Sequence, residues 1–327
     1  MERRDSVLYG NETVRRSLER MASGQRLAQC ILLYGDKGLG KKTLAQWFAQ
    51  RLLCTQPHAP CGNCKNCRTI ARNVHPDVVW VEHSGKLEGF SVDTVRSVCT
   101  HALIAPNSGN RKIYIFADCD KMDARAQNML LKMIEEPPHF VYFIFTASAR
   151  QALLPTILSR LIPFPLAPCT EAQTMQALTD RGFSPEDAQD AICCFHGNIG
   201  QCIGFLEDES VRKLVSLTKE SVHCIINKRE YDLLKTFYQV GSQRTLAARL
   251  LEMLGQVFRD AMVLRMKQNL PCISCDPTGA QALAARLSAA QGQRFHQCIG
   301  KAFAAVSANV NVQLILSALC AELMAGK

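Results

Sequence analysis

Four cysteines of this 327-residue chain fall within 14 residues, at Cys54, Cys61, Cys64 and Cys67. Two successive Cys-x2-Cys steps can direct their thiolates to one centre, and the earlier cysteine completes a tetrahedral set of the kind that binds Zn²⁺. A catalytic zinc keeps one coordination position open, whereas four thiolates leave none, so we expect a structural zinc. An iron–sulfur cluster, which also uses four thiolates, and disulfide bonds are the alternatives.

A glycine-rich turn precedes the cysteines, and its residue types are those of a phosphate-binding P-loop. The residues concerned are Gly35, Gly38, Gly40, Lys41, Lys42 and Thr43. The glycines let backbone N–H groups close around phosphate oxygens, and Lys41 can reach the terminal phosphates. The next residue should carry a hydroxyl for Mg²⁺, but it is Lys42, whose ammonium repels a divalent ion. Because Thr43 lies about 100° further around the helix, we expect weak nucleotide binding or none.

The second part of a nucleotide site is an acidic residue after a neighbouring strand. Residues 112–116 form a strand candidate, and the position that should hold the Mg²⁺-linked aspartate is Ala117. Asp118 or Asp120 could compensate for it. Alternatively, both acids are solvated groups at the end of a strand.

Runs of apolar residues predict the elements that hold these groups. The strand candidates are residues 30–34, 77–81, 112–116 and 141–146, and residues 43–53 are expected to be a helix. Near-continuous apolar strands separated by helices are typical of a parallel sheet covered on both faces, which makes the fold class α/β. Pro163, Pro165 and Pro168 then interrupt the pattern.

After the prolines, helical periodicity replaces the strand pattern. Residues 209–327 carry 15 Lys and Arg against 8 Asp and Glu, so most of the net charge of +9 lies there. A nearby DNA or acidic partner explains this charge, and lysines on solvated helix faces explain it equally well.

Two features bear on the compartment. Residues 302–321 are uncharged and long enough to span a bilayer, but five Ser, Asn and Gln side chains make that costly, so we expect no membrane span. Residues 1–5 carry four charges and no apolar run follows, so we expect no secretory signal. A cytoplasmic location with mostly reduced thiols follows from these expectations.

Further motifs make the pattern specific. His75-Pro76-Asp77 follows the cysteines, residues 128–138 read NMLLKMIEEPP, and Ser159-Arg160 lies just before the prolines. Together with the P-loop and the cysteine insert, these segments resemble the bacterial clamp-loader subunits of DNA polymerase III, which belong to the AAA+ family. The resemblance covers about residues 7–200 and is loose beyond them.

The resemblance implies three domains. Residues 1–165 would be a RecA-like AAA+ nucleotide-fold domain with a zinc module at 54–67. Residues 166–208 would be a small helical lid, and residues 209–327 an all-α collar that mediates oligomerisation.

The resemblance also implies a division of labour, because some subunits of these loaders hydrolyse ATP and another is a non-hydrolysing stator. Lys42, Ala117 and Gly200 stand where hydrolysing subunits carry a metal-binding hydroxyl, a metal-linked acid and a sensor arginine. Arg160 matches the arginine finger that acts in trans on ATP bound to a neighbour. The departures favour the stator, which would act only within the polymerase III holoenzyme and its clamp-loader ATPase.

Partners follow from the same resemblance. They are the other clamp-loader subunits (gamma/tau and delta), with the sliding clamp and primer-template DNA reached through the complex. The alternatives are an ATP-hydrolysing gamma/tau-type subunit or another AAA+ ATPase, and a zinc or redox module that uses its cysteines for chemistry.

Overall fold

The computed structural model divides the chain into two compact units, Met1–Cys169 and Thr170–Lys327. The residues that it describes are 8–24, 28–81, 90–266, 272–308 and 310–325. The first unit is a sheet with helices, and the second is helical throughout its described residues.

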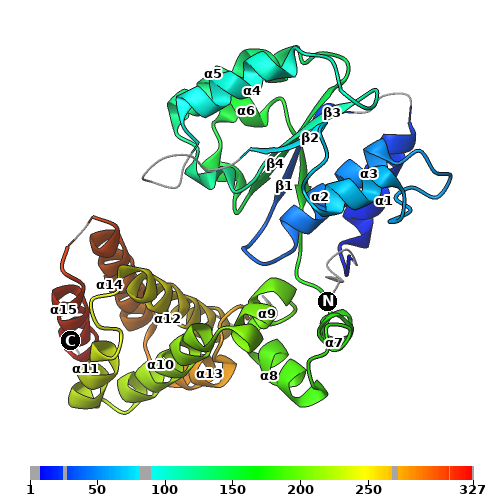
Figure 1. Cartoon of the computed structure of the whole chain (residues 1–327). Coiled ribbons are helices and arrows are strands. Elements are labelled where there is room, and N and C mark those ends of the chain that lie inside the picture. The colour runs from blue at the N-terminus through cyan, green and yellow to red at the C-terminus, as the bar shows by residue number, and fades with distance from the viewer. Residues whose placement is uncertain (1–7, 25–27, 82–89, 267–271, 309, 326–327) are drawn as a thin grey trace. The chain divides into compact units, whose positions relative to one another are not determined.

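The first unit is built on a five-stranded parallel sheet with the strand order β2-β3-β4-β1-β5 (Figure 1). The strands are β1 (Cys30–Tyr34), β2 (Val78–Val81), β3 (Lys112–Phe116), β4 (Val141–Ala147) and β5 (Ile162–Pro165). Every residue of β3 and β4 is buried, as expected for central strands covered on both faces.

Six helices cover the two faces of this sheet (Figure 1). They are α1 (Glu12–Ser23), α2 (Lys41–Leu53), α3 (Lys65–Ala71), α4 (Val92–Ala102), α5 (Ala124–Glu135) and α6 (Pro155–Leu158). Ile31 and Leu33 of β1 join the apolar cluster of α1–α3, whereas Cys30 and Leu32 join that of α4–α6. Strand alternation thus divides the core into two layers, and the predicted α/β fold class is confirmed.

The fifth strand was not predicted from the sequence. Pro163 and Pro165 were expected to interrupt the sheet pattern, yet both lie in β5, which pairs in parallel with β1. The strand order places β5 at an edge, where a residue that lacks an N–H group is tolerated because one side of the strand has no partner to bond.

Nine helices make up the described part of the second unit. They are α7 (Glu171–Thr179), α8 (Pro185–Phe195), α9 (Ile199–Glu207), α10 (Glu209–Ile226), α11 (Glu230–Tyr238), α12 (Arg244–Arg265), α13 (Pro277–Arg286), α14 (Ala289–Ser307) and α15 (Val312–Met324). One apolar cluster is centred on α8 and α9, and a larger one joins α10 to α15.

The uncharged stretch at residues 302–321 is divided between two helices. Asn311 caps the start of α15, because its Oδ1 accepts the N–H groups of Gln313 at 2.9 Å and Leu314 at 3.3 Å. Of the helices that the structure describes, none is long and apolar enough to cross a membrane.

Candidate functional site

The glycine-rich turn connects β1 to α2 in a conformation that needs its glycines. Gly35, Gly38 and Gly40 have φ angles of 144°, 97° and 81°, which side chains disfavour. A Cβ atom at Gly35 would lie 2.6 Å from the carbonyl oxygen of Leu166. The turn therefore has the strand–loop–helix arrangement of a P-loop, with Gly40 directly before the helix.

Lys41, the phosphate-binding lysine of the motif, is turned back onto this loop. Its Nζ donates to the carbonyl oxygens of Gly35 at 2.5 Å and Asp36 at 2.8 Å. The residue is only 5% exposed, and this burial lowers the pKa of its amine, while the nearby carboxylate of Asp118 opposes the shift. A nucleotide phosphate would have to compete with two carbonyl groups for this ammonium.

Lys42, in the position of the missing hydroxyl, forms an ion pair. Its Nζ lies 2.6 Å from Oδ2 of Asp118, just beyond the end of β3. Asp118 adopts a left-handed backbone conformation with φ 58°, and its N–H donates to Oγ1 of Thr146 at 2.9 Å. The lysine after the P-loop motif thus contacts the acid that follows β3, and the two opposite charges offset each other.

Asp120, the second acid that could have compensated for Ala117, has a different role from Asp118. The carboxylate of Asp120 accepts the N–H of Ser148 at 2.8 and 2.9 Å and the N–H of Ala149 at 3.4 Å. These bonds connect the segment after β3 to the segment after β4. Ala117 is buried and, as an alanine, offers no side-chain ligand for a metal.

The four predicted cysteine ligands come together at the end of α2. The sulfur atoms of Cys54, Cys61, Cys64 and Cys67 all lie within 4.8 Å of one another. The Sγ atoms of Cys54 and Cys64 are 3.9 Å apart, close to the separation of about 3.8 Å that a tetrahedral Zn²⁺ with bonds near 2.3 Å requires. This cluster can hold a metal ion.

Backbone N–H groups donate to two sulfur atoms of the cluster. The N–H of Cys64 donates to Sγ of Cys61 at 3.3 Å, and this bond is the main reason why the pKa of Cys61 is lowered to about 6. The N–H of Cys67 donates to Sγ of Cys64 at 3.4 Å. Burial raises the pKa of Cys67, and a bound dication would reverse that shift by favouring the charged form.

The disulfide alternative does not agree with the structure, in which all 16 cysteines are free thiols. Outside the cluster most of them are buried, and burial raises the pKa of Cys30 and Cys275 to about 12 and that of Cys320 to about 11. Within the described residues, the 54–67 cluster is the group of cysteine, histidine and acidic side chains with metal-binding geometry.

Arg160 lies two residues beyond α6 with its guanidinium held on two sides. One of its terminal nitrogens, Nη1, donates to the carbonyl oxygen of Thr156 at 2.7 Å and to Oγ of Ser159 at 3.0 Å. The other, Nη2, forms an ion pair with Oε1 of Glu135, the last residue of α5. The side chain stays 34% exposed, so an outside anion can reach it. Glu135 belongs to the 128–138 motif, but its pairing with Arg160 was not predicted from the sequence.

Gly200 is the second residue of α9, in the helical unit. Asn198 caps this helix by accepting the N–H of Gln201 at 3.1 Å. With glycine at position 200, this turn of the helix has no arginine to offer a phosphate.

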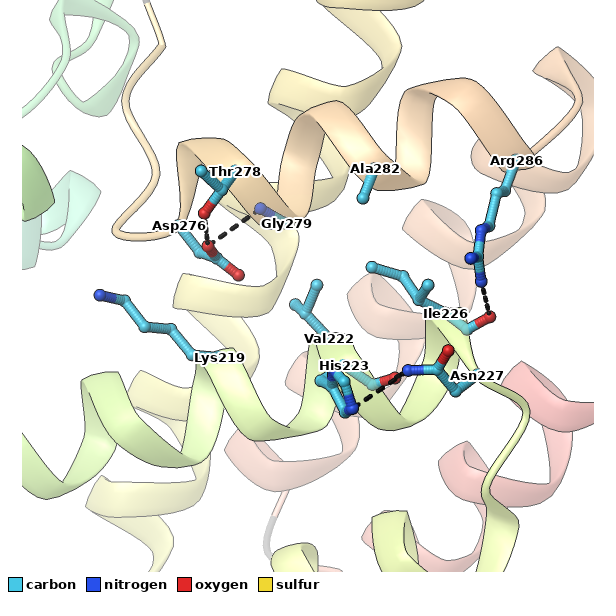
Figure 2. Close-up of a pocket in the computed structure, with 10 residues that line it drawn as sticks. All are labelled: Lys219, Val222, His223, Ile226, Asn227, Asp276, Thr278, Gly279, Ala282 and Arg286. Carbon is cyan, nitrogen blue, oxygen red and sulfur yellow. Dashed lines mark hydrogen bonds between the residues drawn. The ribbon is translucent and has the colours of Figure 1, made fainter.

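The helical unit also contains a recess of about 450 Å³ between α10 and α13 (Figure 2). Several of its polar groups are bonded to each other or to the helices. Nη1 of Arg286 donates to the carbonyl oxygen of Ile226 at 2.8 Å, and Oδ1 of Asp276 accepts the N–H of Gly279 at 3.0 Å. None of the predicted site residues lines this recess, so we assign it no part in the proposed activity.

Comparisons with known proteins agree with the motifs. Residues 10–170 match the family described as DNA polymerase III, delta subunit. The delta prime subunit of DNA polymerase III from Pseudomonas aeruginosa is 30% identical over 208 residues, which are 62% of this chain and 62% of that protein. The delta prime subunit from Bacillus subtilis is 26% identical over 248 residues, 74% of each chain.

A tau/gamma relative matches a shorter stretch. The tau/gamma subunit of DNA polymerase III from Haemophilus influenzae is 30% identical over 173 residues, which are 52% of this chain and 25% of that protein. The chain therefore spans less than two thirds of the length of the Pseudomonas and Haemophilus relatives. The family match and these relatives support a delta-prime-type clamp-loader subunit of DNA polymerase III, to which the chain is similar over about two thirds of its length.

Proposed function

We propose that this subunit acts as a stator of the clamp loader and does not hydrolyse ATP itself. The observation that carries the proposal is the Lys42–Asp118 ion pair, at 2.6 Å. An ammonium in the position of the Mg²⁺-binding hydroxyl opposes a divalent ion, and the acid that might have replaced the missing metal-linked aspartate is paired with it. Lys41 is likewise engaged by the loop's own carbonyl groups.

The second part of the proposal is that Arg160 acts in trans on ATP held by a neighbouring subunit. Such an arginine stabilises charge on the transferred phosphoryl group and can accelerate hydrolysis by about 10³–10⁵-fold. It needs no nucleotide in its own subunit. The partial exposure of Arg160 and its anchored guanidinium support this role.

The metal of the cysteine cluster is proposed to be a structural Zn²⁺. Four thiolates with tetrahedral spacing leave no open position for a substrate, and zinc needs no redox chemistry from the protein. The cluster joins the end of α2 to α3, where Cys64 is the residue before the helix and Cys67 is buried. The metal would hold the segment between α2 and α3 in place within the first unit.

The domain division and the partners complete the proposal. Residues 1–165 would form the nucleotide-fold domain, 166–208 the lid and 209–327 the collar. Tyr231 and Tyr238 of α11 and Leu314 of α15 are 79%, 62% and 68% exposed, which supports a collar that packs against gamma/tau and delta subunits. The sliding clamp and primer-template DNA would be reached through that complex in the cytoplasm.

The test is reconstitution of the complex with gamma/tau and delta subunits, followed by measurement of its ATPase activity. Arg160→Ala in this chain should lower the activity strongly, whereas Lys41→Ala in this chain should leave it unchanged. If Lys41→Ala abolished the activity, the stator proposal would be wrong, and this chain would instead be an ATP-hydrolysing gamma/tau-type subunit.

A further inference from the structure

Glu135, at the end of α5, contacts Arg160, which lies just after α6. The two residues are 25 positions apart in the chain, and they meet because α5 and α6 pack together on one face of the sheet. Their side chains are 44% and 34% exposed, so the pair lies at the surface of the first unit.

The position of Glu135 is unfavourable for the helix that carries it. It ends α5, where the helix dipole presents partial negative charge and basic side chains are preferred. Glu136 adds a second carboxylate directly after it. Two acids at a helix C-terminus work against local helix stability, so the favourable contact of Glu135 is its pairing with the guanidinium of Arg160.

The contacts of Arg160 leave room for a further anion. A guanidinium has five N–H donors in a rigid planar fork. Its contacts with Thr156, Ser159 and Glu135 use three of them, all on the two terminal nitrogens. The N–H of Nε and one N–H of Nη2 are left by these contacts, and a guanidinium can present such donors to phosphate oxygens.

We propose that Glu135 is a positioning residue for Arg160, which fixes the guanidinium plane so that its remaining N–H donors are held ready for a nucleotide phosphate. The inference rests on the proposed trans role of Arg160. Fixing a charged side chain before the reaction removes the entropic and reorganisation cost of placing it in the transition state. Glu135 itself would touch neither substrate nor metal.

The experiment measures steady-state ATPase kinetics of the clamp-loader complex reconstituted with full-length variants of this chain. Glu135→Ala should lower kcat about tenfold, within the roughly 100-fold cost of a 1 Å misplacement, with KM unchanged. Glu135→Gln retains an oxygen that can accept from Nη2 and should recover most of the rate. Glu136→Gln, which removes the neighbouring carboxylate, is the matched control and should behave as the unmodified chain. Melting temperature and complex assembly report whether each variant is folded.

A double variant separates positioning from a structural role. In the Arg160→Ala background, Glu135→Ala should have no further effect on kcat, because its action passes through the arginine. Full additivity of the two changes, an unchanged kcat in Glu135→Ala, or a raised kcat would each overturn the inference. If Arg160→Ala itself left the activity unchanged, the proposed trans role would fail first, and the two failures are thereby distinguished.

Discussion

The ammonium of Lys42 lies 2.6 Å from the carboxylate of Asp118, so the first residue after the P-loop lysine is paired with the acid that follows β3. In a P-loop that binds Mg·ATP, the residue at the place of Lys42 supplies a hydroxyl, and the acid at the place of Ala117 supplies a carboxylate, to the same metal ion. Here Lys42 is paired instead with Asp118, the residue after Ala117. This pairing is the basis of our proposal that the subunit keeps the backbone of a nucleotide site without its metal ligands.

Replacing Lys42 by threonine should improve binding of Mg·ATP by about tenfold, or ~1.4 kcal/mol, because it removes the repulsive ammonium, adds the hydroxyl and leaves Asp118 unpaired. Hydrolysis should stay absent, since Ala117 and Gly200 are unchanged. Titration calorimetry with Mg·ATP measures the affinity. Lys42→Met is the control that removes the charge without adding a ligand, and equal affinities of the two variants would contradict a role for the hydroxyl.

Substitution of Gly35 by alanine should destabilise the first unit by about 1–3 kcal/mol. The added Cβ would lie 2.6 Å from the carbonyl oxygen of Leu166, and the φ of 144° is strained for any side chain. The urea midpoint of unfolding reports the change. Gly109→Ala is the matched control, since its Cβ would only touch a side-chain atom of Leu53 at 3.8 Å. Equal midpoints for the two variants would show that the turn is not as tight as described.

Metal analysis should find about one zinc per chain, and chelation should unfold the insert around residues 54–71 while the sheet persists. Hydrogen exchange localises the loss of structure. Cys64→Ser should reproduce the effect, whereas Cys193→Ser, at an exposed cysteine outside the cluster, should not. A chain that contains iron, or that keeps its insert folded after complete metal removal, would refute the structural zinc.

Metal affinity should rise with pH, because thiols must lose their protons to bind. Burial raises the pKa of Cys67, so at neutral pH this thiol is protonated without metal and releases its proton on binding. Cys61, with its pKa lowered to about 6, is already a thiolate at neutral pH and takes up a proton only as the pH falls through that value. Chelator competition between about pH 6 and 8 tests this expectation. An affinity independent of pH would mean that the thiolates exist without the metal.

Much of the fold could be predicted because its determinants are local. The apolar runs at β1, β3 and β4 are buried on both faces, so they stand out from any alternating pattern. The edge strand β5 could not be predicted in this way, because its prolines are tolerated only through its position in the sheet.

The candidate site also has a part that depends on local sequence and a part that depends on the tertiary fold. The spacing of the cysteines and glycines specifies their geometry within one short segment, so the cluster and the loop were predictable. The pairs Lys42–Asp118 and Glu135–Arg160 join segments that only the tertiary fold brings together. The sequence holds one local indication of the second pair. Glu135 and Glu136 are two acids at the end of α5, where the helix dipole disfavours negative charge, and this indicates that Glu135 has a distant basic partner.

ATP hydrolysis by the purified subunit alone, with and without Mg²⁺, shows most directly whether this chain hydrolyses ATP, and its Lys41→Ala variant is the comparison. We expect the unmodified chain and the variant to show the same background rate, and we expect Mg²⁺ not to change it. Steady Mg²⁺-dependent turnover that Lys41→Ala removes would contradict this expectation.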